Sequence, residues 1–400
     1  MRMLLINPWA IINDKYYASG FIEGMNKFLK VDFVCNNYYD GVAANGKVYP
    51  YFFKHSEKMR RSLLRKVVRG LEYIIAWKKI LKLVRNSEYD VIHFHWLLMY
   101  TIDYSFLNKI MKGKSERTKI VLTAHNVLPH INGEESVSIL KKIYSCFDSI
   151  LVHGESIRQE FIEYFPEFED RVKIQYHGEY YQQCTSGLMM DEKEYLDLKK
   201  KFDNANRVYI MFGGHFYNKG TDRLVRLWHD KFSDSKSLLL ILGRMDDGYK
   251  ELKKVLSDLT GDDNIVFINR FVEDNLLNFC ILQSDCIVLP YRHASMSGVV
   301  YTAAAFKKPL LCTKSGAIAE YLENGVDSIL CEKDDESLLV ALLELERYEK
   351  TELKLMGEKL ANNIHEKYSW EKIAKNIVEV IYRDGDLKDE RNICYNSNIQ

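Results

Sequence analysis

The sequence of 400 residues is poor in proline, carries no net charge and lacks any long apolar run. The 6 prolines argue against long linkers and low-complexity segments. Basic and acidic residues both number 56, so the overall charge gives no case for nucleic-acid binding. No run reaches the roughly 18 apolar residues of a membrane-spanning helix, and the apolar run at residues 3–7 is too short for a signal-peptide core. We therefore expect a cytoplasmic protein.

Paired cysteines and metal-binding signatures are also missing. The eight cysteines are scattered without a Cys-x-x-Cys pair, so we expect neither a zinc site nor a disulfide framework, only reduced thiols. No Asp-x-Asp lies in an evident metal-binding loop, because Asp246-Asp247 and Asp262-Asp263 sit in polar turns. The first apolar run is not followed by Gly-x-Gly-x-x-Gly, which argues against a NAD-dependent dehydrogenase. We predict no metal site.

Short apolar runs alternate with helical patterns along the whole chain, which is typical of βαβ units and parallel sheets. A first series of strands is expected at 3–7, 31–35, 91–95, 119–123 and 149–152. A second series is expected at 207–214, 237–242, 265–268, 286–289, 309–312 and 328–331. The predicted fold class is α/β, with two Rossmann-like doubly wound parallel-sheet domains facing a cleft. In such sheets ligands bind outside the carboxyl ends of the strands, where the strand order reverses.

The domain boundaries follow from the same pattern. We expect an N-terminal domain at residues 1–184 and a C-terminal domain at 185–366. The helical pattern that runs over 352–383 provides a crossing helix at 367–385, and the polar residues 386–400 form a frayed tail.

Seven short motifs occur in an order that characterises one enzyme family. They are Asp90–Trp96 (DVIHFHW), Thr123–His130 (TAHNVLPH), Tyr176-His177-Gly178, Phe212–Asp222 (FGGHFYNKGTD), Ser284–Pro290 (SDCIVLP), Ser295–Pro309 (SMSGVVYTAAAFKKP) and Tyr368–Ala374 (YSWEKIA). Together they resemble the GT-B glycosyltransferases, nearest to glycosyltransferase family 4 and related bacterial polysaccharide enzymes, over about residues 1–385.

This resemblance implies a metal-independent hexosyltransferase with an acceptor-binding first domain and a donor-binding second domain. A UDP- or GDP-sugar would donate its sugar to a hydroxyl of a glycan or lipid-linked oligosaccharide in capsule or exopolysaccharide biosynthesis. The nucleotide sugar is a substrate, so no cofactor is expected. Two alternatives stay open: a degenerate homologue that acts as a non-catalytic partner, and a nucleotide-sugar epimerase of the same architecture.

The resemblance also implies a donor site. Lys219 is the expected diphosphate ligand, while the arginine that the family carries five residues earlier is replaced by Gly214. Arg244 and Arg270 follow strands and are candidates for the second cation. The family pattern Glu-x7-Glu is absent: Thr302 takes the place of the second glutamate, and 294–297 that of the first. The remaining donor-side candidates are Ser295, Ser297, Gly298, Val299 and Glu320, the last of which could instead stabilise a helix N-terminus.

On the acceptor side the catalytic candidate is His125, which follows a strand. It could hydrogen-bond the transferred sugar or act as a base towards an acceptor hydroxyl. A buried structural role is the alternative, and it applies equally to His95, which alternates with His93 on one strand. Ser19-Gly20 resembles the flexible glycine loop of the family.

One segment departs from the neutral charge of the chain. Residues 54–85 hold eleven Lys or Arg and two Glu, a net charge of +9, with apolar residues at helical spacing. A basic amphipathic helix of this kind is typical of a peripheral contact with an anionic membrane surface. A helix packed on the sheet with a solvated basic face is the alternative.

Overall fold

The computed structural model describes residues 1–11, 14–129, 133–180, 192–259 and 263–383. The chain forms two compact units. The N-terminal unit comprises residues 1–153 and 158–178 and the chain from Ser369 on, and the C-terminal unit comprises 154–157 and 179–368. The predicted boundary at residue 184 and the predicted tail at 386–400 lie outside the described residues.

The N-terminal unit is built on a parallel sheet of seven strands in the order β3-β2-β1-β4-β5-β6-β7. The strands are β1 (Arg2–Asn7), β2 (Lys30–Asn36), β3 (Val48–Phe52), β4 (Val91–Phe94), β5 (Lys119–Thr123), β6 (Ser149–Val152) and β7 (Val172–Ile174). Its α-helices are α1 (Asp14–Asn26), α2 (Leu63–Asn86), α3 (Tyr100–Gly113), α4 (Val137–Tyr144), α5 (Glu155–Tyr164) and α13 (Trp370–Asn376), followed by a π-helix at Ile377–Tyr382.

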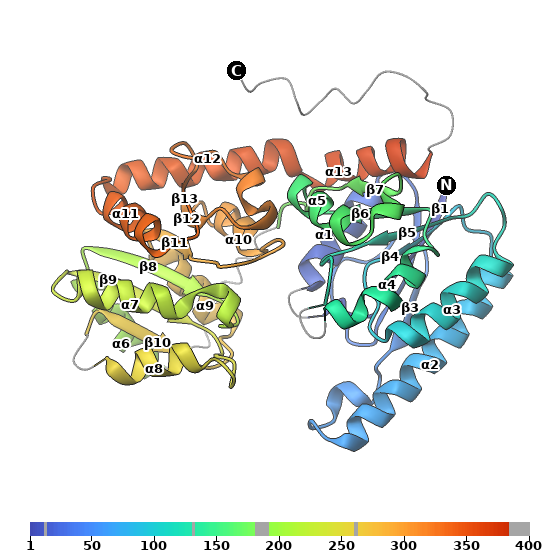
Figure 1. Ribbon diagram of the computed structural model, residues 1–400, viewed down its shortest axis with the longest axis horizontal. Coiled ribbons are helices and arrows are strands. Elements are labelled where there is room, and N and C mark those ends of the chain that lie inside the picture. Colours follow the sequence, from blue (N-terminus) through green and yellow to red (C-terminus); the bar gives the residue numbers. More distant parts are fainter. Residues whose placement is uncertain (12–13, 130–132, 181–191, 260–262, 384–400) are drawn as a thin grey trace. The chain divides into compact units, whose positions relative to one another are not determined.

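The C-terminal unit repeats this plan with six parallel strands in the order β10-β9-β8-β11-β12-β13 (Figure 1). The strands are β8 (Arg207–Phe212), β9 (Ser237–Leu242), β10 (Ile265–Ile268), β11 (Cys286–Leu289), β12 (Leu310–Thr313) and β13 (Ser328–Cys331). The α-helices are α6 (Glu192–Asn204), α7 (Thr221–Phe232), α8 (Lys250–Asp258), α9 (Asp274–Gln283), α10 (Val299–Ala305), α11 (Asp335–Leu345) and α12 (Lys350–Tyr368).

The strands form because their side chains are apolar on both faces. Residues 3–6 of β1 and 238–242 of β9 are at most 3% exposed, as expected for parallel strands covered by helices on both sides. The strand order reverses between β1 and β4 in one sheet and between β8 and β11 in the other. These two reversal points are where ligands of such sheets bind. The α/β fold class with two parallel-sheet domains and a returning C-terminal helix is confirmed.

Four details differ from expectation. The edge strands β3 and β7 were not predicted, because β3 contains Pro50 and β7 has only three residues. The segment around Ser19-Gly20, expected as a flexible glycine loop, is helical, since α1 buries a stripe that begins at Tyr17. The single helix expected over 352–383 is interrupted at Ser369, where α12 gives way to α13. The crossing segment belongs to the N-terminal unit from there on.

Trp370 anchors this C-terminal segment in the N-terminal unit. The red α13 packs against the blue α1 in Figure 1, and the Trp370 side chain is 1% exposed. A Cβ on Gly20 or Gly178 would overlap with the indole, and one on Gly24 would overlap with the backbone of Trp370. The small residues are therefore needed for the close approach of the last helix.

Two further features bear on the sequence predictions. The six cysteines within the described ranges are buried free thiols. Across those same ranges, no helix is both long and apolar enough to cross a membrane.

Candidate functional site

The reversal point of the C-terminal sheet is shaped by glycines with positive φ angles. Gly213 follows β8 with a φ of +112°, and Gly243 follows β9 with a φ of +133°. A Cβ on Gly243 would overlap with the carbonyl oxygen of Gly213, and one on Gly220 would overlap with that of Pro290. Only glycine combines these φ angles with such close backbone approaches. The result is a backbone-lined edge at the ends of β8, β9 and β11.

Lys219 lies at this edge, at the end of a 3-10 turn that leads into α7. Its ammonium lies 3.9 Å from the ring centroid of Tyr291, a cation–π contact. Among the described residues no carboxylate forms an ion pair with it. The N-cap residue of α7, Gly220, has no side chain to cap the helix, and in the first turn the Asp222 amide donates to the Tyr249 hydroxyl at 3.3 Å. A cation beside a helix N-terminus suits an anionic ligand.

The fully buried His215 stabilises the turn that carries Lys219 through hydrogen bonds of its ring. The His215 Nε2 donates to the carbonyl of Leu242 at 3.2 Å, so its Nδ1 accepts from the Thr221 hydroxyl at 3.0 Å. Burial lowers the pKa of His215 to about 4, which keeps the ring neutral. The histidine thus fixes the loop between β8 and α7.

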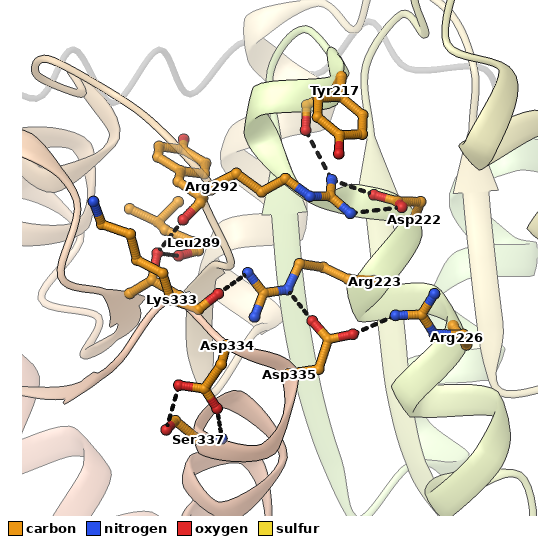
Figure 2. A network of polar contacts seen from close by, with 12 residues as sticks. Tyr217, Asp222, Arg223, Arg226, Leu289, Arg292, Lys333, Asp334, Asp335 and Ser337 are labelled. Carbon is orange, nitrogen blue, oxygen red and sulfur yellow. Dashed lines mark hydrogen bonds and ion pairs between the residues drawn. The ribbon is translucent and has the colours of Figure 1, made fainter.

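A second brace comes from Arg292, three residues beyond β11 (Figure 2). Its guanidinium donates to both carboxylate oxygens of Asp222 at 2.7 and 2.8 Å and to the carbonyl of Tyr217 at 2.9 Å. Burial works to raise the pKa of Asp222, but the hydrogen bonds from Arg292 hold it below its usual value. Sequence reasoning missed Arg292, although its place just after a strand is the signal used for Arg244 and Arg270.

The lower half of Figure 2 shows how α7 is tied to α11. The Arg223 side chain is 2% exposed, contacts Asp335 at 2.8 Å and donates to the carbonyl of Lys333 at 2.5 Å. Arg226 pairs with the other oxygen of Asp335. Asp334 caps α11 by accepting from the backbone of Ser337 at 2.7 Å. These contacts position α7, whose N-terminus directly follows the turn that carries Lys219.

The two arginines that the sequence offered as a second cation are placed differently. Arg270 donates to both oxygens of Glu194 on α6 at 2.6 Å, so its guanidinium is already engaged. Arg244 follows β9, is 64% exposed and lies 3.9 Å from Asp247. Gly214, at the position of the family arginine, is exposed at the end of β8. Among these three predicted residues, only Arg244 keeps a largely solvent-exposed charge.

The predicted loop before α10 is tightly hydrogen-bonded. The Ser297 hydroxyl lies 3.3 Å from that of Tyr291 and accepts from the Val299 amide at 3.4 Å. The Thr302 hydroxyl donates to the carbonyl of Gly298 inside the helix at 3.3 Å. The carbonyl of Ser295 accepts from the amide of Ala317 at 2.9 Å.

Glu320 lies at the N-terminus of a helix, although not its own. Its carboxylate accepts from the amides of Glu155 and Ser156 at 2.8 Å each and from the Ser156 hydroxyl at 2.6 Å. Residues 154–157, which include the first three residues of α5, are part of the C-terminal unit, whereas the rest of α5 belongs to the N-terminal unit. This geometry is that of a helix-capping carboxylate, the alternative noted for Glu320 from the sequence.

The reversal point of the N-terminal sheet carries a cluster of histidines around Tyr17. The ring centroid of Tyr17 lies 5.2 Å from His95, 4.8 Å from His125, 5.6 Å from His153 and 4.7 Å from His177. Burial lowers the pKa of all four histidines, that of His153 to about 4. The cluster is therefore neutral at pH 7.

The histidines differ in how their nitrogens are used. His93 bonds Tyr382 at 2.5 Å and Thr123 at 2.8 Å, so both its nitrogens serve the fold. His125 bonds His153 through Nδ1 at 3.1 Å, and His95 contacts Asn7 through Nδ1 at 3.5 Å. The Nε2 atoms of His95 and His125 are buried and have no hydrogen-bond partner among the described residues. Both residues line a hollow of about 70 Å³.

Asp14 and Trp96 complete this site and were not singled out from the sequence. Trp96 stacks on the His125 ring with centroids 4.5 Å apart and donates to Asp14 at 2.8 Å. Burial raises the pKa of Asp14 to about 6, against the hydrogen bonds from Asn7 and Trp96. A carboxyl with such a pKa at the start of α1 is a candidate acid or base. Its place shortly after the first predicted strand was the available signal.

Ser19 and Gly20 require a correction. They lie inside α1 and not in a flexible glycine loop. The Ser19 hydroxyl accepts from the amide of Val42 at 3.2 Å, and Gly20 packs against Trp370. The local sequence looks turn-like, but the buried stripe of α1 imposes a helix.

Comparisons with known proteins agree with this architecture. Residues 207–347 match the family description "Glycosyl transferases group 1". N-acetyl-alpha-D-glucosaminyl L-malate synthase from Bacillus anthracis is 24% identical over 362 residues, which cover 86% of this chain and 87% of that protein. Anabaena Alr3699/HepE in complex with UDP and glucose aligns with a TM-score of 0.66 at 13% identity, covering 95% and 98% of the two chains. The catalytic domain of starch synthase IV from Arabidopsis thaliana, bound to ADP and acarbose, aligns with a TM-score of 0.70 at 12% identity, covering 94% and 98%.

Proposed function

We propose that this chain, a GT-B glycosyltransferase of the family 4 type, transfers a sugar from a UDP- or GDP-sugar to a hydroxyl of a glycan or lipid-linked oligosaccharide. The observation that carries the proposal is the glycine-lined strand edge with Lys219 beside the N-terminus of α7. It lies within the segment that matches the glycosyltransferase family. Structural neighbours described with UDP or ADP support a nucleoside diphosphate as the ligand.

The chemistry asks for stabilisation of the leaving diphosphate. Its charge grows as the bond to the sugar breaks, and fixed cations and helix amides offset this charge without rearranging. Lys219 and the first amides of α7 are the groups we assign to that task. The loop around Ser297 and Gly298 would contact the sugar and phosphate oxygens through its backbone amides. We assign no metal ion to this step.

The first experiment is calorimetric titration of the protein with UDP, GDP, ADP, CMP and TDP, with EDTA present. We expect one diphosphate to bind, and Lys219→Met to weaken it about 10- to 150-fold, because a charge-assisted hydrogen bond contributes roughly 1.5–3 kcal/mol. Arg270→Met is the matched control, since its guanidinium is held by Glu194. Equal affinity of wild type and Lys219→Met would remove Lys219 from the site. No binding of any nucleotide would favour a non-catalytic partner.

We also propose that helix α2 of the N-terminal unit makes a peripheral contact with an anionic membrane. Helix α2 buries Tyr73, Ala76, Trp77 and Ile80, and leaves the opposite face exposed. On that face Leu63, Val67, Leu71 and Ile75 recur every four residues with exposures of 79, 53, 57 and 50%. Lys78, Lys82 and Arg85 continue the same face and are exposed. An exposed apolar stripe next to cations suits the headgroup region of a bilayer better than water.

Sedimentation with vesicles tests this proposal. Leu63→Gln with Val67→Gln should reduce binding to phosphatidylglycerol vesicles, as should Arg60→Gln with Lys66→Gln. Arg69→Gln is the control, because Arg69 pairs with Glu57 at 2.6 Å and contributes less free charge. Wild-type protein that stays in the supernatant at low salt would refute membrane contact without affecting the nucleotide site.

A further inference from the structure

Three neighbouring strands of the N-terminal sheet each deliver one polar group to a single row. His125 lies two residues beyond β5, His153 directly follows β6 and Gln175 directly follows β7. The carboxyl ends of parallel strands meet at one edge of the sheet, which brings these distant residues together. The His125 Nδ1 lies 3.1 Å from the His153 Nε2, and the His153 Nδ1 lies 2.9 Å from the carbonyl oxygen of Gln175.

This row fixes the positions of the ring protons. A carbonyl oxygen only accepts, so the His153 Nδ1 must carry the hydrogen. A neutral imidazole has one N–H, and the His153 Nε2 is therefore an acceptor. The His125 Nδ1 must then donate to it, which leaves the His125 Nε2 as a lone pair. Both rings are neutral because burial lowers the pKa of each histidine.

The lone pair of His125 is not used by a hydrogen bond within the described part of the chain. The Nε2 is buried without a partner in the described part of the chain, and His125 lines the hollow of about 70 Å³. Trp96, stacked at 4.5 Å with an interplanar angle of 6°, keeps the ring from turning. A space of this size admits a hydroxyl or hydroxymethyl group rather than a whole sugar ring.

We propose that His153 is a positioning residue that, by accepting the Nδ1–H of His125, presents the Nε2 of His125 to a substrate hydroxyl as a hydrogen-bond acceptor. The identity of the ligand group as a substrate hydroxyl rests on the proposed function. The positions of the ring protons do not. It excludes the opposite arrangement, in which His125 donates from Nε2 to a substrate oxygen. The hydroxyl donates to His125, so this contact favours a substrate group that loses or shares its proton during transfer.

The proton positions can be measured without substrate. Nitrogen-15 NMR of histidine-labelled protein distinguishes bare from protonated ring nitrogens, and His125→Gln assigns the signals of His125. We expect Nδ1 protonated and Nε2 bare in the wild type and in His153→Gln, whose amide oxygen replaces the acceptor. In His153→Phe, which keeps a ring but has no acceptor, the Nε2–H form should appear. A wild-type His125 with the proton on Nε2 would overturn the proposal, whatever the protein transfers.

Kinetics then separate positioning from packing. Once a transfer assay exists, His153→Phe should lower kcat by ~10- to 100-fold, by analogy with the loss when a metal-bound histidine loses the hydrogen-bond partner that orients it. The nucleotide dissociation constant should stay within twofold. His153→Gln should recover most of the loss. Equal defects in the two variants, each folded by circular dichroism, would show that the ring matters only for packing and would refute the role. Failure of nucleotide binding in the wild type would instead refute the proposed function.

Discussion

Acidification should unfold the N-terminal unit before the C-terminal unit. Among the described residues, five histidines of the N-terminal unit have lowered pKa values, namely 93, 95, 125, 153 and 177, against one in the C-terminal unit, His215. An unfolded histidine binds a proton near pH 6.5, whereas these folded rings do not. Below pH 6.5 the unfolded state therefore binds more protons, and the free energy of unfolding falls as the pH falls.

The size of the effect follows from the pKa differences. Between pH 6.5 and 5 each fully buried histidine lowers the free energy of unfolding by up to ~2 kcal/mol. Five such histidines set an upper bound of ~10 kcal/mol on the loss. Burial raises the pKa of Asp14 to about 6 and that of Asp103 to about 7, so these groups take up protons in the folded state and oppose the trend. Their stability gain at pH 5 is at most ~4 kcal/mol. A net loss of ~6 kcal/mol is comparable with the whole stability of a typical domain.

Urea unfolding followed by tryptophan fluorescence at pH 7.5, 6 and 5 measures this loss. Trp228→Phe leaves tryptophans only in the N-terminal unit, so its signal reports on that unit alone. We expect its midpoint to drop steeply between pH 7 and 5. The wild type should retain a second transition, from Trp228, that changes less. A midpoint that stays constant down to pH 4, where ordinary carboxylates titrate, would refute the assignment of neutral buried histidines.

Two substitutions test the glycine-lined strand ends of the C-terminal unit and the Arg292–Asp222 pair beside them, and a third, in α2, is a contrasting glycine. Gly243→Ala should destabilise the C-terminal unit by at least ~2 kcal/mol, because a side chain at this φ is strained and meets the Gly213 carbonyl; an unchanged urea midpoint would contradict this. Gly70→Ala, in the exposed part of α2 with nothing within 4 Å, should instead leave stability equal or raise it by ~1 kcal/mol. Asp222→Asn should cost ~3 kcal/mol by leaving Arg292 without its charged partner, and a double-mutant cycle with Arg292→Met isolates that pairing.

The strand pattern could be predicted because it rests on local properties. Parallel strands are buried on both faces, so runs such as 238–242 are almost wholly apolar and stand out in the sequence. His125 could be placed because it follows a predicted strand, whereas Lys219 was assigned through the resemblance of its motif. The edge strands β3 and β7 are partly exposed and lack that apolar signature, so the sequence did not predict them.

The pairings of the side chains could not be predicted in the same way. Arg270 and Glu194 are 76 residues apart, and the sequence does not show that they meet. Glu320 reaches the start of α5, which lies more than 160 residues earlier. The hydrogen bonds of His153 depend on β5, β6 and β7 being neighbours in the sheet. Its own sequence motif resembles a plain strand end and does not indicate these partners. Contacts of this kind depend on the folded arrangement and not on local spacing.

The close fit of Trp370 against Gly20, Gly24 and Gly178 has a consequence for how the protein is made. When residue 178 has been synthesised, about 190 residues up to Trp370 remain to be made, roughly 10–40 s of synthesis. During that time Tyr17 and Phe21 lack the indole that covers them. The C-terminal unit is almost continuous in the chain and does not wait in this way. Folding is therefore expected to finish in the reverse of the order of synthesis, with the first half of the protein completed last.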